Sequence, residues 1–166
     1  DFGVPQNRER VFIVGINRDK FKNADIENSF WFPKEDKPTK LGDILSNNLD
    51  VDDSFTISKR MWEGHKKRKE RNKKAGKGFG YSLFNHDSTH ANTISARYWK
   101  DGSEILIDQK NVNKRPRVLT LREAARLQGF PEKFRYDAVS KKEFYKQMGN
   151  SVAVPVIEAV RDHLLI

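Results

Sequence analysis

The segment 59–77 constrains the fold of this chain more than any other stretch. It holds ten lysines and arginines against two glutamates, so its local charge of +8 accounts for most of the +9 carried by all 166 residues. A block of like charges at this density repels itself and cannot enter a hydrophobic core. Because a polyanion releases counterions when such a block neutralises it, nucleic acid is the first candidate ligand.

The basic block is predicted to form a helix. Ser58 is suited to cap a helix that begins at Lys59, and Gly76 is suited to end it. Met61 and Trp62 are nearly its only apolar residues, so core burial cannot hold it in place. It is either a solvated surface helix or a helix ordered against phosphates, and the one-sided charge favours phosphates. The candidate phosphate-binding residues are Lys59, Arg60, Lys66, Lys67, Arg68, Lys69, Arg71, Lys73, Lys74 and Lys77.

Glycines alternate with aromatic residues directly after the basic block, as Gly78, Phe79, Gly80 and Tyr81. Glycine lets a backbone approach a partner closely, and an exposed ring is able to wedge or stack at bases. We therefore expect this loop to contact bases. The pattern does not lie between a strand and a helix, so it does not indicate a dinucleotide-binding loop. A plain glycine-rich turn is the alternative interpretation.

The chain contains no cysteine, which excludes disulfides, thiolate metal clusters and a cysteine nucleophile on this polypeptide. Its length suits one domain, or one small domain with pieces of another. The most apolar run, 11–16, is too short to cross a membrane, so no membrane partner is expected. Because the sequence begins at Asp1 and enters a predicted strand within ten residues, we expect a fragment of a longer protein.

The N-terminal segment is predicted to be extended and to end in a buried strand. Residues 11–16 form a continuous apolar run, which is typical of strands covered by helices on both faces of an α/β sheet. Extension from Gln6 onward would place Gln6, Arg8 and Arg10 on one face of the segment. The alternative is a charged, solvated entry to the strand.

Three further features are predicted in the middle of the chain. Apolar residues recur at helical spacing over 41–49, which indicates a short helix. Residues 92–98 and 104–108 are predicted to pair as a β-hairpin around a Lys-Asp-Gly turn. His86 and His90 stand four residues apart without a third ligand, so no metal site is expected.

The C-terminal third is predicted to be helical. Thr120 and Glu123 have the spacing of a capping box for a helix that ends before Gly129. Ser140 is suited to begin a second helix, and Asn150-Ser151 to cap a last helix over 153–165. Together with the strands upstream, these elements predict an α+β fold.

Three blocks of the sequence occur in an order and spacing that are specific when taken together. The first is Pro5-Gln6-Asn7-Arg8-Glu9-Arg10, the second is RVLTLREAARLQGFP at 117–131, and the third is YKQMGNSVAVP at 145–155. They resemble the QxRxR, RxLTxREaaRlqGFP and GNSV motifs of the C-terminal half of the DNA cytosine-5 methyltransferases, in particular the Dcm-like branch. The resemblance covers essentially the whole chain.

The resemblance implies a base-flipping enzyme of restriction-modification systems. Such an enzyme transfers a methyl group from S-adenosylmethionine to C5 of a cytosine in a specific sequence of double-stranded DNA. The family's cofactor loop, Pro-Cys nucleophile loop and Glu-Asn-Val motif precede QxRxR and are not in this sequence. The isolated chain is therefore predicted to be inactive and to need an N-terminal catalytic half, from the same parent chain or a separate subunit. The resemblance also implies a bacterial or phage-encoded protein of the cytoplasm.

The resemblance assigns roles to matching positions. Gln6, Arg8 and Arg10 would support the catalytic site, and Asn150 and Ser151 would close the S-adenosylmethionine pocket. DNA would be read by Thr93, Ile94, Ser95 and Arg97 together with the glycine-rich loop. Residues 1–20 and 136–166 would belong to an incomplete Rossmann-like catalytic domain, and 21–135 to the target-recognition domain.

Two other functions stay open from the sequence. A non-catalytic DNA-binding module or regulatory subunit would share the basic block, and an RNA-binding domain would show no preference for duplex DNA. A Pro-Cys motif and a glycine-rich loop upstream in the parent reading frame would distinguish the enzyme from the binding module. Apolar surface on an incomplete domain also predicts self-association.

Overall fold

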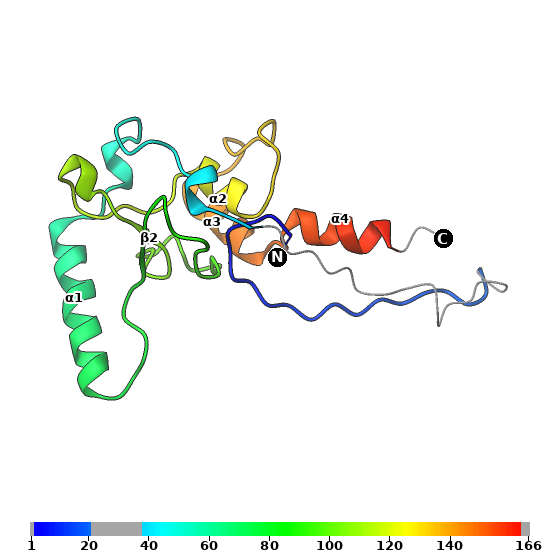
Figure 1. Ribbon diagram of the computed structural model, residues 1–166, viewed down its shortest axis with the longest axis horizontal. Helices are drawn as coiled ribbons and strands as arrows, with labels where there is room; N and C mark the ends of the chain where they lie inside the picture. The colour runs from blue at the N-terminus through cyan, green and yellow to red at the C-terminus, as the bar shows by residue number, and fades with distance from the viewer. Residues whose placement is uncertain (1, 21–37, 164–166) are drawn as a thin grey trace.

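The computed structural model describes residues 2–20 and 38–163, and η denotes a 3-10 helix. The elements in chain order are η1 (Leu41–Asp43), η2 (Asp53–Phe55), α1 (Lys59–Lys74), β1 (Leu83–Phe84), β2 (Leu106–Ile107), η3 (Lys110–Val112), α2 (Leu121–Leu127), α3 (Lys141–Asn150) and α4 (Val154–Asp162). A central body of short elements and loops carries α1 on one side, while α4 and the N-terminal segment extend from the other (Figure 1). The described part is a mixed α+β structure, as predicted.

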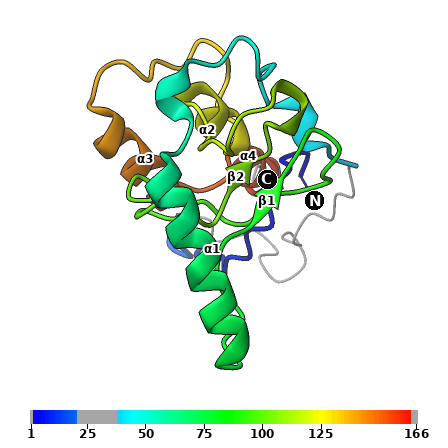
Figure 2. The same ribbon diagram turned by 90° about the vertical axis from the view of Figure 1, so that its left-hand side faces the viewer.

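Helix α1 confirms the prediction for the basic block. The Ser58 hydroxyl accepts a hydrogen bond from the Met61 amide at 3.1 Å, which caps the first turn. Gly76 follows the last turn with a φ of 65°, a left-handed conformation that glycine adopts without strain. Figure 2 shows the far end of α1 projecting well beyond the body. The helix therefore presents most of its basic side chains to solvent.

The predicted hairpin is wrong. Strand β2 pairs in parallel with β1, with Leu83 opposite Leu106, and residues 92–98 form no strand. The buried positions in this stretch are Ala91, Ile94 and Tyr98, so burial recurs every three or four residues rather than every two. That spacing fits a chain of turns packed on the core, and a strand with one buried face would need alternation.

The strand predicted at 11–16 depends on neighbouring strands that the described residues do not supply. The segment is extended but pairs with no described strand, and the side chains of Val11 and Ile13 are 89% and 94% exposed. An apolar run forms a buried strand only where neighbouring strands and helices cover it. The described residues leave one face of this segment uncovered.

The predicted helix at 41–49 shortens to the 3-10 turn η1. Leu41, Ile44 and Leu45 are buried as expected, but Leu49 is 73% exposed. The cause is a competing side-chain hydrogen bond, because the Asn47 side chain accepts from the Leu49 amide at 3.0 Å. Asparagine side chains that bind the backbone two residues ahead favour a turn over a helix.

A buried ion pair between Arg117 and Glu123 lies within the core. Arg117 and Glu123 are fully buried, and their two hydrogen bonds measure 2.7 and 2.9 Å. Glu123 also accepts from the Thr120 amide, while Thr120 accepts from the Glu123 amide, which confirms the predicted capping box of α2. Around this pair the main apolar side chains come from loops, α2 and α3, namely Leu41, Ile94, Tyr98, Ile105, Ile107, Leu119, Leu127, Phe144, Tyr145 and Met148.

The cap predicted for the last helix is wrong, although a helix does form there with Pro155 in its first turn. Asn150 is the last residue of α3, and Ser151 follows as its C-terminal cap. Helix α4 starts after Ala153, which forms no side-chain cap. The Val154 amide donates to the Gln128 carbonyl at 2.8 Å, so a tertiary contact satisfies a donor that a cap would otherwise satisfy. The end of the predicted helix, 164–166, lies outside the described residues.

Candidate functional site

Gln6 joins three distant segments inside the protein. Its side chain is buried, and its Nε2 donates to the Leu127 carbonyl and the Gln128 Oε1 atom, both at 3.1 Å. Its Oε1 accepts from the Ile94 amide at 3.1 Å. Both polar ends of the side chain are therefore used within the chain, so Gln6 positions its neighbours rather than touching a ligand.

Arg8 continues this network toward the end of α3. Its guanidinium donates to the carbonyls of Ile94 at 3.2 Å, Gly149 at 3.0 Å and Ser151 at 2.5 Å. Burial, and secondarily the nearby charge of Arg10, lowers the pKa of Arg8 from its ordinary value. Three carbonyl acceptors hold this cation in place without a carboxylate partner in the described residues.

Gly149 makes this junction possible. A Cβ at Gly149 would collide with the backbone of Ser95 and Ala96. The end of α3 therefore touches the segment 92–98 through the main chain. We call 92–98 the recognition segment, after the role predicted for it. The sequence blocks 5–10, 117–131 and 145–155 converge at this one place, which we call the junction.

The prediction that Gln6, Arg8 and Arg10 share one role is only partly met. Gln6 and Arg8 both face the junction, whereas Arg10 is exposed and donates to the neighbouring Glu9 carbonyl. Arg10 nevertheless lines two surface hollows, whereas Gln6 and Arg8 line only the first of them. Of the three, Arg10 is the side chain free to reach a ligand.

The residues of 93–97 that were predicted to read DNA differ in how exposed they are, and only Arg97 is fully exposed. Ile94 is fully buried in the core, so its predicted contact with DNA does not fit this conformation. The Thr93 hydroxyl donates to the Asn7 carbonyl at 2.6 Å, and the Ser95 hydroxyl donates to Glu104. Arg97 is exposed. The side chains of Thr93 and Ser95 hold the loop, and Arg97 faces solvent.

Two of the ten basic residues on the helix and its end form ion pairs within the protein, and Nζ of Lys69 lies 4.3 Å from the centre of the Tyr81 ring. Arg68 forms an ion pair with Asp101 at 3.0 Å and donates to the Gly80 carbonyl from Nε and Nη2, at 3.1 and 2.9 Å. Lys66 pairs with Glu63 at 2.8 Å. The other eight are exposed, and they are Lys59, Arg60, Lys67, Lys69, Arg71, Lys73, Lys74 and Lys77.

His65 anchors α1 beside Arg68. The side chain is buried, its Nε2 lies 3.1 Å from the Asp101 carbonyl, and its Nδ1 lies 3.0 Å from Nη2 of Arg68. Because the arginine can only donate, Nδ1 accepts and Nε2 carries the proton, which makes the ring neutral. Burial lowers the pKa of His65 accordingly.

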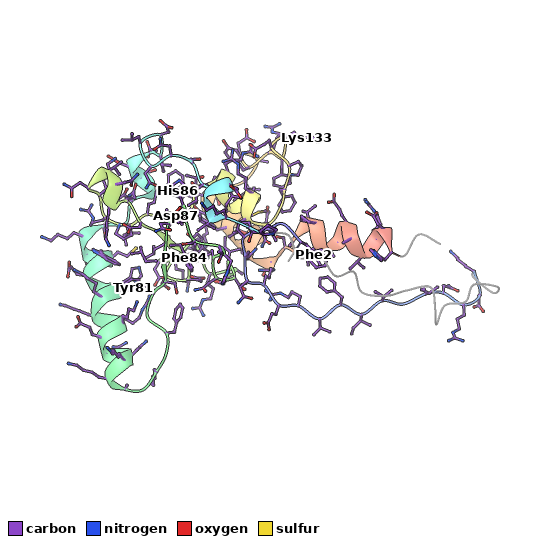
Figure 3. All side chains as sticks on the ribbon, viewed as in Figure 1. Phe2, Tyr81, Phe84, His86, Asp87 and Lys133 are labelled. Atoms are coloured by element: carbon purple, nitrogen blue, oxygen red, sulfur yellow. The ribbon has the colours of Figure 1, made fainter. Side chains whose placement is uncertain are left out.

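The glycine-rich loop divides into a packed part and an exposed part. Gly80 is buried, and a Cβ there would lie 2.6 Å from the Cα of Lys69. The Tyr81 ring meets Trp62 edge to face at 4.9 Å, and Figure 3 shows Tyr81 beside α1. Phe79 is 52% exposed. Tyr81 thus fastens the loop to α1, while Gly78 and Phe79 are the parts that reach solvent.

The residues predicted to close a cofactor pocket lie at the end of α3 and not at a helix N-terminus. The Ser151 hydroxyl donates to the Met148 carbonyl at 2.9 Å and its carbonyl accepts from Arg8, so both its oxygens are engaged. Asn150 is exposed. A hollow of about 490 Å³ lies next to this turn, with Val152, Ala153, Val156 and Val160 along one wall. These four side chains form one apolar wall of the hollow.

A second hollow, of about 570 Å³, lies between the N-terminal segment and the recognition segment. It is lined by Asn7, Glu9, Arg10, Phe79, Asn92, Thr93 and Glu104. No local sequence signal points to Asn92 or Glu104, which stand twelve positions apart in the chain. Their proximity follows from a hydrogen bond of 3.0 Å between the Asn92 Nδ2 atom and the Glu104 carbonyl.

Within 2–20 and 38–163, no cluster of three or more histidines and carboxylates has the geometry of a metal site. In the same ranges, no helix combines the length and hydropathy needed to cross a membrane.

Comparison with solved structures supports the class of fold. The structure of S. pombe Dnmt2 methyltransferase matches with a TM-score of 0.63 and 21% identity over 99% of this chain and 54% of its own. A variant of Spodoptera frugiperda DNMT2 matches with a TM-score of 0.66 and 18% identity, over 99% of this chain and 55% of its own. At these identities the likeness shows the fold alone, which is that of part of a methyltransferase.

Sequence comparison identifies the family. The model of the C-5 cytosine-specific DNA methylases matches residues 1–165, so the chain belongs to that family. The Type II methyltransferase M1.ScrFI of Lactococcus lactis is 56% identical over 99% of this chain and 41% of its own length. M.SsoII of Shigella sonnei is 55% identical over 99% and 42%. The DNA-cytosine methyltransferase of Escherichia coli K12 is 37% identical over 95% and 37%. The chain spans less than half the length of these relatives.

Proposed function

We propose that this chain is the DNA-recognition and C-terminal part of a DNA cytosine-5 methyltransferase. The complete enzyme transfers a methyl group from S-adenosylmethionine to C5 of a flipped cytosine within a specific duplex sequence. In this proposal, residues 21–135 recognise DNA, while 1–20 and 136–166 complete a Rossmann-like catalytic domain. The chain alone is inactive, because it has no cysteine to attack the base.

The junction is the observation that carries the proposal. Gln6 and Arg8 tie the first motif block to the recognition segment at Ile94 and to the third block at Gly149 and Ser151. A mutual arrangement fixed by six hydrogen bonds from two side chains would keep a recognition surface in register with a catalytic domain. A simple DNA-binding module would not need this link to the C-terminal helices.

We assign DNA contacts to the side chains that are exposed and supporting roles to those that bind within the protein. Arg10 is exposed between the two hollows and is placed to hold a phosphate or the flipped nucleotide. The eight exposed cations of α1 and its end hold the DNA backbone without reading sequence. Phe79 and Arg97 reach solvent and contact bases. Arg68, Lys66 and Ile94 support these groups from within the protein.

S-adenosylmethionine would supply the methyl group when bound. Asn150 is exposed two residues before Val152, which lines the 490 Å³ hollow, and would contact the cofactor from there, while Ser151 holds the turn through Met148 and Arg8. Val152, Ala153, Val156 and Val160 would line the apolar edge. These residues shape the site, and the chemistry itself requires groups on the N-terminal half.

The N-terminal catalytic half would bind to the apolar surface formed by the N-terminal segment, Val152 and α4. Val11, Ile13, Val152 and Ile157 are exposed, with fractions between 40% and 94%. Exposed apolar area of this kind marks a contact surface. In the absence of the catalytic half, we expect the same surface to promote self-association.

The proposal is tested by methyl transfer from radiolabelled S-adenosylmethionine to duplex DNA. The purified chain should transfer none. A chimera should be active if it joins this chain to the part of M1.ScrFI that precedes the matched region. Replacing the nucleophilic cysteine of that part by serine is the matched control. Methylation by the isolated chain, or an inactive chimera that is folded and binds DNA, would contradict the proposal.

A further inference from the structure

The 570 Å³ hollow between the N-terminal and recognition segments contains a half-buried carboxylate without a counter-ion. Glu104 forms no ion pair in the described residues, in a chain with a net charge of +9. Its Oε1 atom accepts from the Ser95 hydroxyl, which fixes the orientation of the carboxylate. Because Glu104 is half-buried and held in place at the wall of a hollow, it presents a fixed acceptor to any ligand that enters.

The second polar group of the hollow is held equally firmly. Asn92 donates from Nδ2 to the Ser82 hydroxyl at 2.8 Å and to the Glu104 carbonyl at 3.0 Å. A carbonyl accepts only, so Nδ2 must face Glu104 and both its hydrogens are occupied. The free polar atom of Asn92 is therefore its Oδ1, which is an acceptor. The two anchored groups of the hollow, Asn92 and Glu104, thus both present acceptors.

An aromatic ring, one exposed cation and the exposed carboxylate of Glu9 complete the hollow. Phe79 lies at its edge and is placed there by α1, because the Asn72 side chain donates to the Phe79 carbonyl and Arg68 donates to the next carbonyl. Arg10 lines the same hollow and is exposed. An aromatic face beside two anchored acceptors, with the Arg10 cation next to them, suits one nucleobase of a DNA duplex and its phosphate.

We infer that this hollow is a base-reading subsite that takes the exocyclic amine of a cytosine or adenine in the major groove. Those two bases present an N–H donor at the groove, whereas guanine and thymine present carbonyl acceptors that two anchored acceptors repel. Glu104 is the specificity-determining residue, and Ser95 and Asn92 position it. The inference rests on the proposed function, because it names the base contact that the recognition part makes.

The test is selection of sequences from a randomised duplex library by the full 166-residue chain. The wild-type chain should enrich cytosine or adenine at one position, and Glu104→Gln should lose that preference while its affinity for the unselected library stays unchanged. Glutamine keeps the size of the side chain but replaces one acceptor by a donor. The control variant Glu132→Gln changes a carboxylate far along the chain and should keep the preference. Circular dichroism establishes that each variant is folded.

A second measurement leaves the protein unaltered. N4-methylcytosine or N6-methyladenine at the preferred position fills the groove-facing N–H with a methyl group, and we expect affinity to fall about tenfold. The modified base that weakens binding distinguishes cytosine from adenine. Unchanged affinity with both modified bases, or the same base preference in Glu104→Gln, overturns the inference. Duplex binding without any base preference overturns it and leaves DNA binding intact, while no duplex binding at all overturns the proposed function as well.

Discussion

The buried ion pair predicts a large loss of stability when Glu123 is replaced by alanine. Arg117 would remain fully buried with its charge uncompensated, since its remaining partners are the Asn48 side chain at 2.9 Å and the carbonyls of Val118 and Ser46. Breaking one side of such a pair costs about 3–5 kcal/mol. The change also removes the acceptor of the Ser46 and Thr120 amides, which worsens the loss.

The assay is urea denaturation monitored by circular dichroism. The free energies of unfolding are compared between variants whose dependence on urea concentration has the same slope. We expect Glu123→Ala to lose about 4 kcal/mol, and Glu123→Gln to lose less because it retains an acceptor of the same shape. The control is Glu132→Ala, which breaks an exposed pair with Arg126 and should change stability far less. A loss in Glu123→Ala no larger than in this control would refute the argument that the pair holds the core together.

Three further predictions concern the junction and α1. Gly149→Ala should lower the free energy of unfolding by about 1–3 kcal/mol, because its Cβ meets the backbone of Ser95 and Ala96. The control Gly15→Ala places its Cβ in open space and should lose little stability. Thermal melting compares the two variants. The pKa of His65 is lowered in the folded chain, so the unfolded state binds more protons than the folded state. The free energy of unfolding should therefore fall as the pH drops below about 6.5, and it should fall less in His65→Gln. Denaturation at pH 5 and pH 8 measures both. Neutralising Lys67, Arg71 and Lys74 together should weaken binding to all duplexes and reduce the slope of log affinity against log salt by up to about 3. Fluorescence anisotropy measures this slope, and an unchanged slope would exclude phosphate contact. Arg68→Ala should instead destabilise α1, because Arg68 pairs with Asp101.

Local signals predicted the helices well. Ser58 and Gly76 set both ends of α1, and Thr120 with Glu123 set the start of α2. These features act within four residues of each other, so no knowledge of the fold was needed. The same holds for the single-sign charge of the basic block.

Local signals did not decide the predictions that depended on distant partners. The apolar run 11–16 has the composition of a buried strand but no described strand beside it, and 92–98 pack as turns because their buried positions follow the core and not a hairpin partner. Asn150-Ser151 end one helix instead of starting the next, because the Gln128 carbonyl already satisfies the first amide of α4. In each case, a contact from elsewhere in the chain decided the outcome.

The sequence by itself determined the family, the basic character of α1 and the presence of the residues at the junction. Only the tertiary structure decided which of them are free to bind. Arg8 and Arg10 differ by two positions and have the same side chain, yet one is committed to three carbonyls and the other faces solvent. Glu104 and Asn92 likewise carry no local signal. The physical reason is that availability depends on hydrogen-bond partners, and the fold brings those partners from segments far apart in the chain.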